Sequence, residues 1–277
     1  MLKQRTLTAL VLAPLAVAMI LLLPTAGFAL VIAAISLQAL WEWTRLAGVA
    51  SSATRVAFVA ANAALMYLLW LQRATPFAAC AIGAGVAWWL LSLLWLRHFS
   101  YAAAPTRENA LLKLLAAELA VLPAWLAFVQ LHGEDDHGHH WALFVIVLVW
   151  AADTGAYFAG KRWGTTKLAP RISPNKTRAG AYGALVLAGV VALVGGWLLG
   201  RREASMLIAL LALALLTVLA SILGDLIESL LKRQANVKDS GTLFPGHGGL
   251  LDRVDSVFSA VPVFVAGKAV LDLLLAR

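Results

Sequence analysis

The chain has 277 residues, of which 62% are hydrophobic and only 13% are charged, and its mean hydropathy is +0.84. This composition and the long apolar runs are typical of an integral membrane protein and exclude a soluble helical protein, whose helices need more polar faces. The single cysteine, Cys80, excludes an intrachain disulfide. The formal net charge of +8 indicates a basic protein surface.

Apolar segments of about the length needed to cross a bilayer follow one another along the whole chain. They cover residues 7–23, 26–40, 56–71, 78–96, 111–130, 141–159, 182–199, 205–223 and 257–275. Only Pro24 and Thr25 separate the first two, so they form a tight hairpin or one of them does not span. The sequence therefore predicts an all-α, polytopic bundle of about nine transmembrane helices in a single membrane domain over residues 1–277. No cleavable signal peptide is recognisable.

The lysine and arginine residues are unevenly distributed between the two ends of these segments. If the N-terminus is cytoplasmic and the spans alternate, most of the 22 basic residues lie on the cytoplasmic side. This asymmetry follows the positive-inside rule and predicts an external C-terminus. The positive charge then faces anionic headgroups and nucleotide phosphates, so we expect no nucleic-acid partner.

Residues 1–140 carry little recognisable chemistry, and we interpret them mainly as scaffold. Residues 41–45 place Glu42 between two tryptophans and Arg45 shortly after them, a pattern typical of an aromatic belt with an acid and a base paired nearby. The external loop 132–140 offers a transition-metal site or is a mobile acidic loop. We favour the mobile loop, because no sequence feature fixes its imidazoles. The candidate metal ligands there are His137, His139 and His140.

Residues 141–277 contain the candidate catalytic half, with cytoplasmic loops 160–180 and 229–255. Asp153 interrupts an apolar helix, which marks a functional candidate in a membrane, and Gly155 allows a neighbouring helix to approach. The loop 160–180 is rich in basic residues. It either sets topology through lipid contact or clamps substrate phosphates. Its basic residues are Lys161, Arg162, Lys167, Arg171, Lys176 and Arg178.

A polar stripe follows on the eighth segment. Helical spacing places Ser221, Asp225, Glu228, Ser229 and Lys232 on one face of an otherwise apolar helix. Carboxylates at the end of such a helix are costly unless they are paired or bind a metal ion. Farther on, Lys268 and Asp272 have i, i+4 spacing, and we interpret them as a structural ion pair.

Segment 229–255 concentrates charge more strongly than any other part of the chain. Glycines on both sides of His247 suit the backbone to an anionic ligand such as phosphate. If a helix begins after these glycines, Asp252 and Asp255 lie on one face, and hard oxygen ligands of this kind favour Mg²⁺. The alternative is a solvated loop followed by a helix start with acids at its positive end.

The pattern of this segment resembles the signature of the bacterial phosphatidate cytidylyltransferase family, also called CDP-diglyceride synthases. The matching residues are Ser229, Lys232, Arg233, Lys238, Asp239, Gly241, Phe244, Pro245, His247, Gly248, Gly249, Asp252, Arg253, Val254 and Asp255. A second block, with residues 153–158, Gly160, 167–174 and 176–177, is also similar to the family. The Trp-Glu-Gly of the family is replaced there by residues 178–180, Arg-Ala-Gly, so we assign no acid role to that part.

The resemblance implies transfer of CMP from CTP to phosphatidic acid, giving CDP-diacylglycerol and pyrophosphate, at the cytoplasmic face of a bacterial inner membrane. Because several phosphates must meet, we expect Mg²⁺, with one or two cations. The bilayer, CTP and phosphatidic acid are the expected partners, and a homodimer is compatible with the sequence. The resemblance implies the catalytic residues Asp225, Lys232, Asp252 and Asp255, with Asp225, Glu228, Asp252 and Asp255 as metal ligands. It implies the substrate-binding residues Asp153, Lys167, Arg171, Ser173, Lys176, Arg233, Lys238, Asp239, His247, Gly248, Gly249 and Arg253.

Two other functions remain as alternatives. A CTP-dependent lipid or polyprenol kinase shares the spans, the acids and a nucleotide loop, and differs by transferring a γ-phosphate. A transporter or channel uses intramembrane acids such as Asp153 and Asp225 as ion ligands. Transport requires acids near the middle of the bilayer, whereas these acids gather near the predicted cytoplasmic edge.

Overall fold

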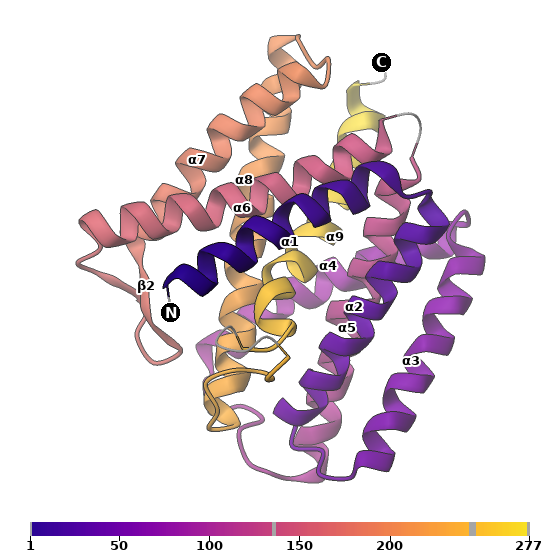
Figure 1. The fold of residues 1–277 in the computed structure, drawn as a ribbon, viewed down its shortest axis with the longest axis vertical. Helices are drawn as coiled ribbons and strands as arrows, with labels where there is room; N and C mark the ends of the chain where they lie inside the picture. The colour runs from indigo at the N-terminus through magenta and orange to yellow at the C-terminus, as the bar shows by residue number, and fades with distance from the viewer. Residues whose placement is uncertain (1, 135–136, 244–247, 276–277) are drawn as a thin grey trace.

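The computed structural model describes residues 2–134, 137–243 and 248–275, and these residues form a bundle of nine helices (Figure 1). Eight of the described helices, all except α1, are long and apolar enough to cross a membrane. The described chain is thus an all-α, multi-pass bundle, as the hydropathy pattern predicted. The helices are α1 (Leu2–Leu22), α2 (Thr25–Leu46), α3 (Ser52–Gln72), α4 (Pro76–Arg97), α5 (Arg107–His132), α6 (Gly138–Trp163), α7 (Arg178–Leu198), α8 (Ala204–Gln234) and α9 (Leu251–Leu275).

The centre of the bundle is built around α5 and α9. Helix α5 is the most deeply buried of the candidate spans and packs against α2, α4 and α9. Buried indoles join these helices: Trp125 donates its Nε1–H to the Ala29 carbonyl oxygen over 3.0 Å, and Trp89 donates to that of Phe258 over 3.2 Å. Polar groups in a bilayer need such internal partners, because no water is available to them.

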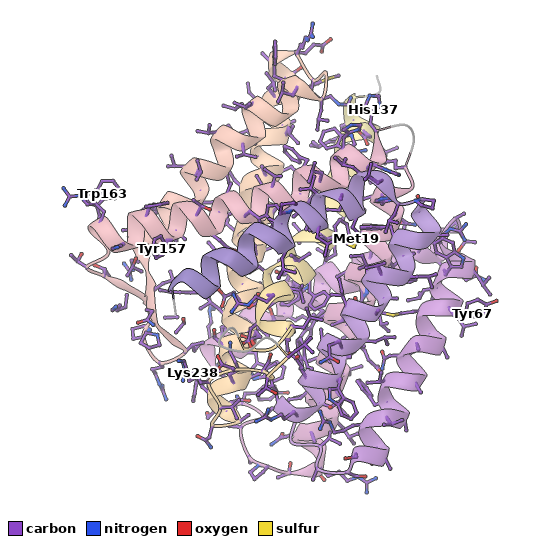
Figure 2. All side chains as sticks on the ribbon, viewed as in Figure 1. Met19, Tyr67, His137, Tyr157, Trp163 and Lys238 are labelled. Carbon is purple, nitrogen blue, oxygen red and sulfur yellow. The ribbon has the colours of Figure 1, made fainter. Side chains whose placement is uncertain are left out.

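The outer surface of the bundle is apolar, as a lipid-facing surface must be. Helix α3 lies at one edge of the bundle, and Asn62 and Met66 are its only buried described residues. Figure 2 shows Tyr67 on α3 and Trp163 on α6 pointing away from the bundle, and both side chains are more than 60% exposed. Exposed apolar side chains of this kind are unfavourable in water and favourable in lipid, so this surface suits a bilayer.

Small residues bring α6 and α7 into close contact. Gly155 of α6 faces Gly183 of α7 so closely that a Cβ atom on either would collide with backbone of the other. Backbone contact of this kind lets van der Waals packing hold membrane helices together. The prediction that Gly155 admits a neighbouring helix is confirmed.

A β-hairpin lies between α6 and α7, where the sequence indicated only a basic loop. Strands β1 (Lys167–Ala169) and β2 (Ser173–Thr177) pair antiparallel, with Lys167 opposite Thr177 and Ala169 opposite Ser173. The Thr177 hydroxyl then accepts a hydrogen bond from the Gly180 N–H and caps the start of α7. This hairpin holds the basic side chains in a fixed register beside the end of α6.

Helices α8 and α9 both extend beyond the apolar segments that predicted them. Helix α8 continues from the apolar segment 205–223 to Gln234, as the polar stripe to Lys232 predicted, and α9 begins at Leu251 rather than near residue 257. The additional turns carry charged side chains that pair inside the protein, so hydropathy alone made both apolar segments too short. Asp252 and Asp255 therefore belong to one helix, as their spacing predicted.

The turn between α5 and α6 differs from the predicted mobile loop. His132 lies on α5, its Nε2 is 2.9 Å from the Ile20 carbonyl oxygen, and its ring stacks on Phe28 and His139. His139 Nδ1 is 3.2 Å from the Leu21 carbonyl oxygen. For His139 the expectation that nothing fixes the imidazole is therefore wrong, because its ring contacts α1 and stacks on His132. No group of potential metal ligands in the described residues includes His137, His139 or His140.

The predicted ion pair on α9 is confirmed. Lys268 Nζ lies 2.7 Å from Asp272 Oδ2 and also 2.9 Å from Glu134 Oε2. The pair thus ties the end of α9 to the α5–α6 turn. This arrangement supports the structural interpretation of both residues.

Candidate active site

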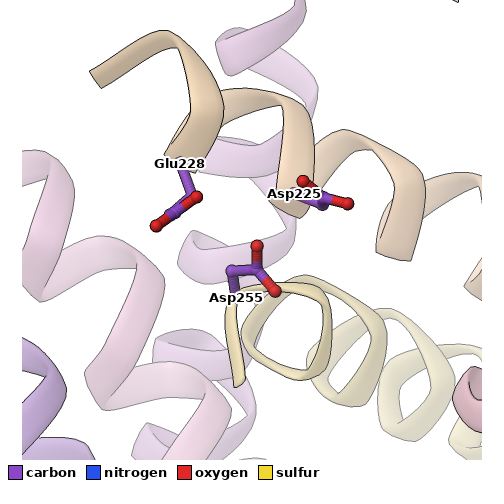
Figure 3. Close-up of side chains that lie close together, drawn as sticks. All are labelled: Asp225, Glu228 and Asp255. Carbon is purple, nitrogen blue, oxygen red and sulfur yellow. The ribbon is translucent and has the colours of Figure 1, made fainter. Parts of the chain in front are cut away.

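Three carboxylates meet where α8 packs against α9. Asp225 and Glu228 come from successive turns of α8, and Asp255 comes from the first turns of α9 (Figure 3). One oxygen of each lies within 4.8 Å of the others. Gly224 permits this approach, because a Cβ at that position would collide with Ser259 of α9. The sequence predicted this convergence for these three residues, which we call the acidic triad.

The donor set of the acidic triad fits a divalent cation. Glu228 is only 1% exposed, and its Oε1 atom has no hydrogen-bond partner among the described residues. A buried carboxylate oxygen without a donor is strongly unfavourable unless a cation neutralises it. Carboxylate oxygens are hard ligands of the kind that Mg²⁺ accepts in proteins. The triad could therefore hold a metal ion.

Asp252 has a different environment from the triad. Its Oδ1 lies 2.6 Å from Lys232 Nζ, and its Oδ2 accepts hydrogen bonds from the Ser240 N–H and hydroxyl, both over 3.0 Å. The Gly249 N–H donates to the same oxygen over 2.7 Å. Both oxygens are thus already used, and Asp252 lies outside the group of converging ligands. Asp252 as a metal ligand therefore stays a prediction, whereas its observed contacts organise the chain that leads into α9.

Lys232 connects Asp252 to the acidic triad. Its Nζ lies 2.5 Å from Glu228 Oε2 and 2.6 Å from Asp252 Oδ1. A cation between two buried carboxylates offsets part of their mutual repulsion. Lys232 therefore holds the end of α8 against the start of α9.

Glu42 is a site residue that the sequence interpretation missed. Its side chain is 3% exposed, and it accepts hydrogen bonds from the Ser240 hydroxyl at 2.7 Å and from the Leu250 and Leu251 N–H groups, both at 2.9 Å. The expected pairing with Arg45 is wrong: among the described residues, no ion pair joins the two. A buried acid at the end of an apolar helix was the available signal, the same one that marked Glu228.

A cavity of about 300 Å³ opens beside the acidic triad, between α6, α7, α8 and the hairpin. Asp153, Lys176 and Asp225 line it together with apolar side chains such as Ile222. Lys176 forms an ion pair with Asp225. The cavity thus combines a basic group, an apolar wall and direct access to one carboxylate of the triad.

The remaining expected substrate-binding residues are spread around this centre. Arg233 donates from Nε to the Ile172 carbonyl oxygen over 3.2 Å and so ties α8 to the hairpin, while the Arg171 guanidinium lies 5.2 Å from the centre of the Phe99 ring. The Gly249 N–H is already bonded to Asp252, so it is not a free donor for phosphate. His247 lies outside the described residues. Lys167, Lys238, Asp239 and Arg253 are exposed, whereas Ser173 and Gly248 are half-buried.

Gly248 adopts a backbone conformation that favours glycine. Its φ is +84°, and a Cβ there would meet Asp252 Oδ2 at 2.6 Å. Only glycine lets the backbone pass this close to the Asp252 carboxylate. Gly248 therefore serves the turn into α9.

The fold and the site together define a class, that of multi-pass membrane proteins with a carboxylate centre beside a partly basic cavity. The Cytidylyltransferase family model matches residues 3–270. The chain therefore belongs to the cytidylyltransferase family. This membership agrees with the resemblance carried by the two sequence blocks.

Curated relatives match over nearly the whole chain. The phosphatidate cytidylyltransferase of Pseudomonas aeruginosa is 43% identical over 270 residues, which cover 96% of each protein. That of Haemophilus influenzae is 37% identical over 288 residues, covering 95% of this chain and 97% of the relative. That of Bacillus subtilis is 43% identical over 138 residues, which cover 49% of each protein.

Proposed function

We propose that the chain is a phosphatidate cytidylyltransferase whose reaction centre is the acidic triad. It transfers CMP from CTP to phosphatidic acid and gives CDP-diacylglycerol and pyrophosphate. The observation that carries the assignment to this site is the convergence of Asp225, Glu228 and Asp255 within 4.8 Å beside a cavity with a basic wall. Full-length similarity to proteins of that name supports the reaction.

The chemistry of the reaction requires neutralisation of charge more than proton transfer. The attacking phosphate of phosphatidic acid is already largely ionised near neutral pH, so no strong general base is needed. A Mg²⁺ ion held by the triad would supply Lewis-acid stabilisation of the phosphate oxygens during displacement. The residues of the chain then position the reactants in line and exclude water.

The cavity between α6 and α8 suits the lipid substrate. Its apolar wall adjoins the bilayer-facing part of α6, and Lys176 offers an ammonium group to a phosphate headgroup. Lys176 pairs with Asp225 in the ligand-free protein. Exchange of that carboxylate for the substrate phosphate frees Asp225 for the cation. Asp153 lies on the same wall of the cavity.

Lys232 and Asp252 serve the reaction by positioning. Lys232 sets the orientation of Glu228, and Asp252 fixes the backbone that leads into α9, on which Asp255 lies. Such support is needed because a displacement of about 1 Å in a reacting group is enough to reduce the rate about 100-fold. The basic residues of the connection, among them Lys238 and Arg253, face CTP from the cytoplasmic side of a bacterial inner membrane.

The proposal is tested by incubating purified protein in detergent with CTP, phosphatidic acid and Mg²⁺ and identifying both products. We expect CDP-diacylglycerol and pyrophosphate, with activity lost on titration with EDTA and restored by added Mg²⁺. Release of CDP with a phosphorylated lipid would identify a kinase instead. Turnover that is unchanged in excess EDTA would refute the cation at the triad while leaving the transferase assignment standing.

A further inference from the structure

A second pocket is lined by Glu42 and contains no residue of the acidic triad. It has a volume of about 270 Å³ and opens between the end of α2, the start of α3 and the chain that follows α8. We call it the arginine pocket, because its charged lining includes two guanidinium groups. Its polar lining residues are Gln38, Glu42, Arg45, Arg55, Ser240 and Thr242.

Arg55 is held in a fixed position in this pocket. Its Nε donates to the Thr44 hydroxyl over 2.8 Å, and its Nη2 donates to the Trp41 carbonyl oxygen over 2.9 Å. The guanidinium carbon also lies 3.8 Å from the centre of the Trp41 ring. A guanidinium stacked and hydrogen-bonded in this way loses little further freedom when it binds an anion.

The positive charge of the pocket is only partly offset by the described residues, because two guanidinium groups share the lining with one carboxylate. Among the described residues, no carboxylate forms an ion pair with Arg45 or Arg55. The one carboxylate in the lining, Glu42, already accepts hydrogen bonds from four donors, which belong to Gln38, Ser240, Leu250 and Leu251. Two guanidinium groups with donors still available form a site for phosphate oxygens.

The pocket is connected to the reaction centre through Ser240. Ser240 lines the pocket, and its hydroxyl lies 3.0 Å from Asp252 Oδ2. Asp252 in turn binds Lys232, which contacts Glu228 of the acidic triad. A ligand in the pocket therefore lies against the same short segment that positions the triad. The pocket volume is several times the roughly 30 Å³ taken by one water molecule.

We propose that the arginine pocket binds the polyphosphate of the nucleoside triphosphate, with Arg45 and Arg55 as its ligands. This inference rests on the proposed function, because it assigns the second substrate of the same reaction. The lipid phosphate carries the same chemistry, but it enters from the apolar cavity beside α6, on another face of the site. Assignment of the two phosphates to two pockets keeps their charges apart before transfer.

Inorganic pyrophosphate is the probe for the first test. Calorimetric titration of the purified full chain in detergent should show pyrophosphate binding that weakens roughly 10-fold or more in Arg55→Gln and in Arg45→Gln, because charged hydrogen bonds are lost. This measurement does not depend on turnover, so it separates a failed pocket from a failed reaction assignment. Equal binding by wild type and both variants would overturn the proposal.

The second test separates the two phosphate sources. In Arg55→Gln the KM for CTP should rise roughly 10-fold or more while the KM for phosphatidic acid stays unchanged. A rise in the KM for phosphatidic acid alone would overturn the proposal and indicate a lipid headgroup in the pocket. If Arg55→Gln does not fold, Arg45→Gln gives the same test, because the structure shows no such anchoring contacts for Arg45.

Arg73 provides a matched control. Its guanidinium carbon also lies 3.8 Å from a tryptophan ring, that of Trp70, and its Nη1 donates to the Trp70 carbonyl oxygen over 2.7 Å. It follows the opposite end of α3 and does not line the arginine pocket. Arg73→Gln should therefore leave pyrophosphate binding and both KM values unchanged. If Arg73→Gln weakened pyrophosphate binding and raised the KM for CTP as much as Arg55→Gln does, the effect would be a general one of arginine–tryptophan stacking. The proposed site would then be overturned.

Discussion

At the residue scale, Asp255 and Asp252 belong to the same helix but have different partners. Asp255 faces Asp225 and Glu228, whereas Asp252 faces Lys232, Ser240 and the backbone of the turn. Their identical chemistry and close spacing hid this division in the sequence. The contacts of each side chain, rather than its type, therefore determine which of them is a candidate metal ligand.

Substitution of Asp255 tests its assignment to the triad. Asp255→Asn keeps the size of the side chain but removes a charge from the group that would hold the cation, so turnover should fall at least about 100-fold. CDP-diacylglycerol formation at saturating Mg²⁺ measures this, and size-exclusion elution of the detergent complex reports folding. Asp272→Asn, at the far end of α9, is the matched control and should keep near-normal turnover. Wild-type turnover in Asp255→Asn would remove Asp255 from the centre.

Glu42 positions the chain between α8 and α9 and does not contact a reacting atom in this proposal. Glu42→Gln removes the charge that strengthens hydrogen bonds from Leu250, Leu251 and Ser240, at a cost of about 2 kcal/mol in stability. We expect kcat to fall about tenfold while the KM for phosphatidic acid changes little, which is the pattern of a lost positioning contact.

The control for Glu42 is an acid away from the site. Glu108→Gln removes an exposed carboxylate in the first turn of α5 and should change neither kcat nor the melting temperature measurably. Glu42→Asp keeps the charge but shortens its reach, so it should recover part of the lost kcat. If kcat in Glu42→Gln stayed at the wild-type value despite a lower melting temperature, Glu42 would be a stabilising residue only.

At the scale of the elements, the contact between α6 and α7 depends on glycine. Gly155→Ala should lower stability by about 1–3 kcal/mol, because the new methyl group overlaps the Gly183 backbone. Thermal unfolding in detergent measures the change. Gly83→Ala in α4 is the control, since a Cβ there meets nothing within 4 Å, and it should be neutral or slightly stabilising. Equal melting temperatures for the two variants would contradict a tight α6–α7 contact.

The sequence predicted the elements better than the connections between them. Hydropathy found every described helix, because lipid-facing and buried turns are both apolar. It ended the α8 segment too early and began the α9 segment too late, since Lys232 and Asp252 satisfy each other only in the folded chain. The β-hairpin was missed because β1 has three residues and β2 has five, too few for an alternating pattern to be recognised.

Site residues that are close in the sequence could be predicted to lie together, whereas residues far apart in the sequence could not. The spacing of Asp225 and Glu228 placed both on one face of α8, that of Asp252 and Asp255 placed both on one face of α9, and the resemblance joined the two groups in one site. Glu42 precedes its partner Ser240 by 198 positions, so no local pattern could pair them. Tertiary contacts of this range are found only in the folded structure.

At the scale of the whole molecule, the basic residues predict the orientation of the bundle in its membrane. We expect a cytoplasmic N-terminus and an external C-terminus, which places the hairpin and the α8–α9 connection on the cytoplasmic side. Alkaline phosphatase fused after residue 277 should be active in cells, and green fluorescent protein fused there should be dark. The reverse result would place the acidic triad on the side without CTP and would contradict the proposed reaction.

The contact between Glu42 and the start of α9 makes the first helices part of the working enzyme. A chimaera that joins residues 1–140 of one homologue to residues 141–277 of another inherits the acid from one parent and the turn that receives it from the other. Whether the hybrid is active then depends on this contact between the two halves rather than on overall sequence identity. The two halves can be exchanged only between parents that both have Glu42 and Ser240 at the corresponding positions.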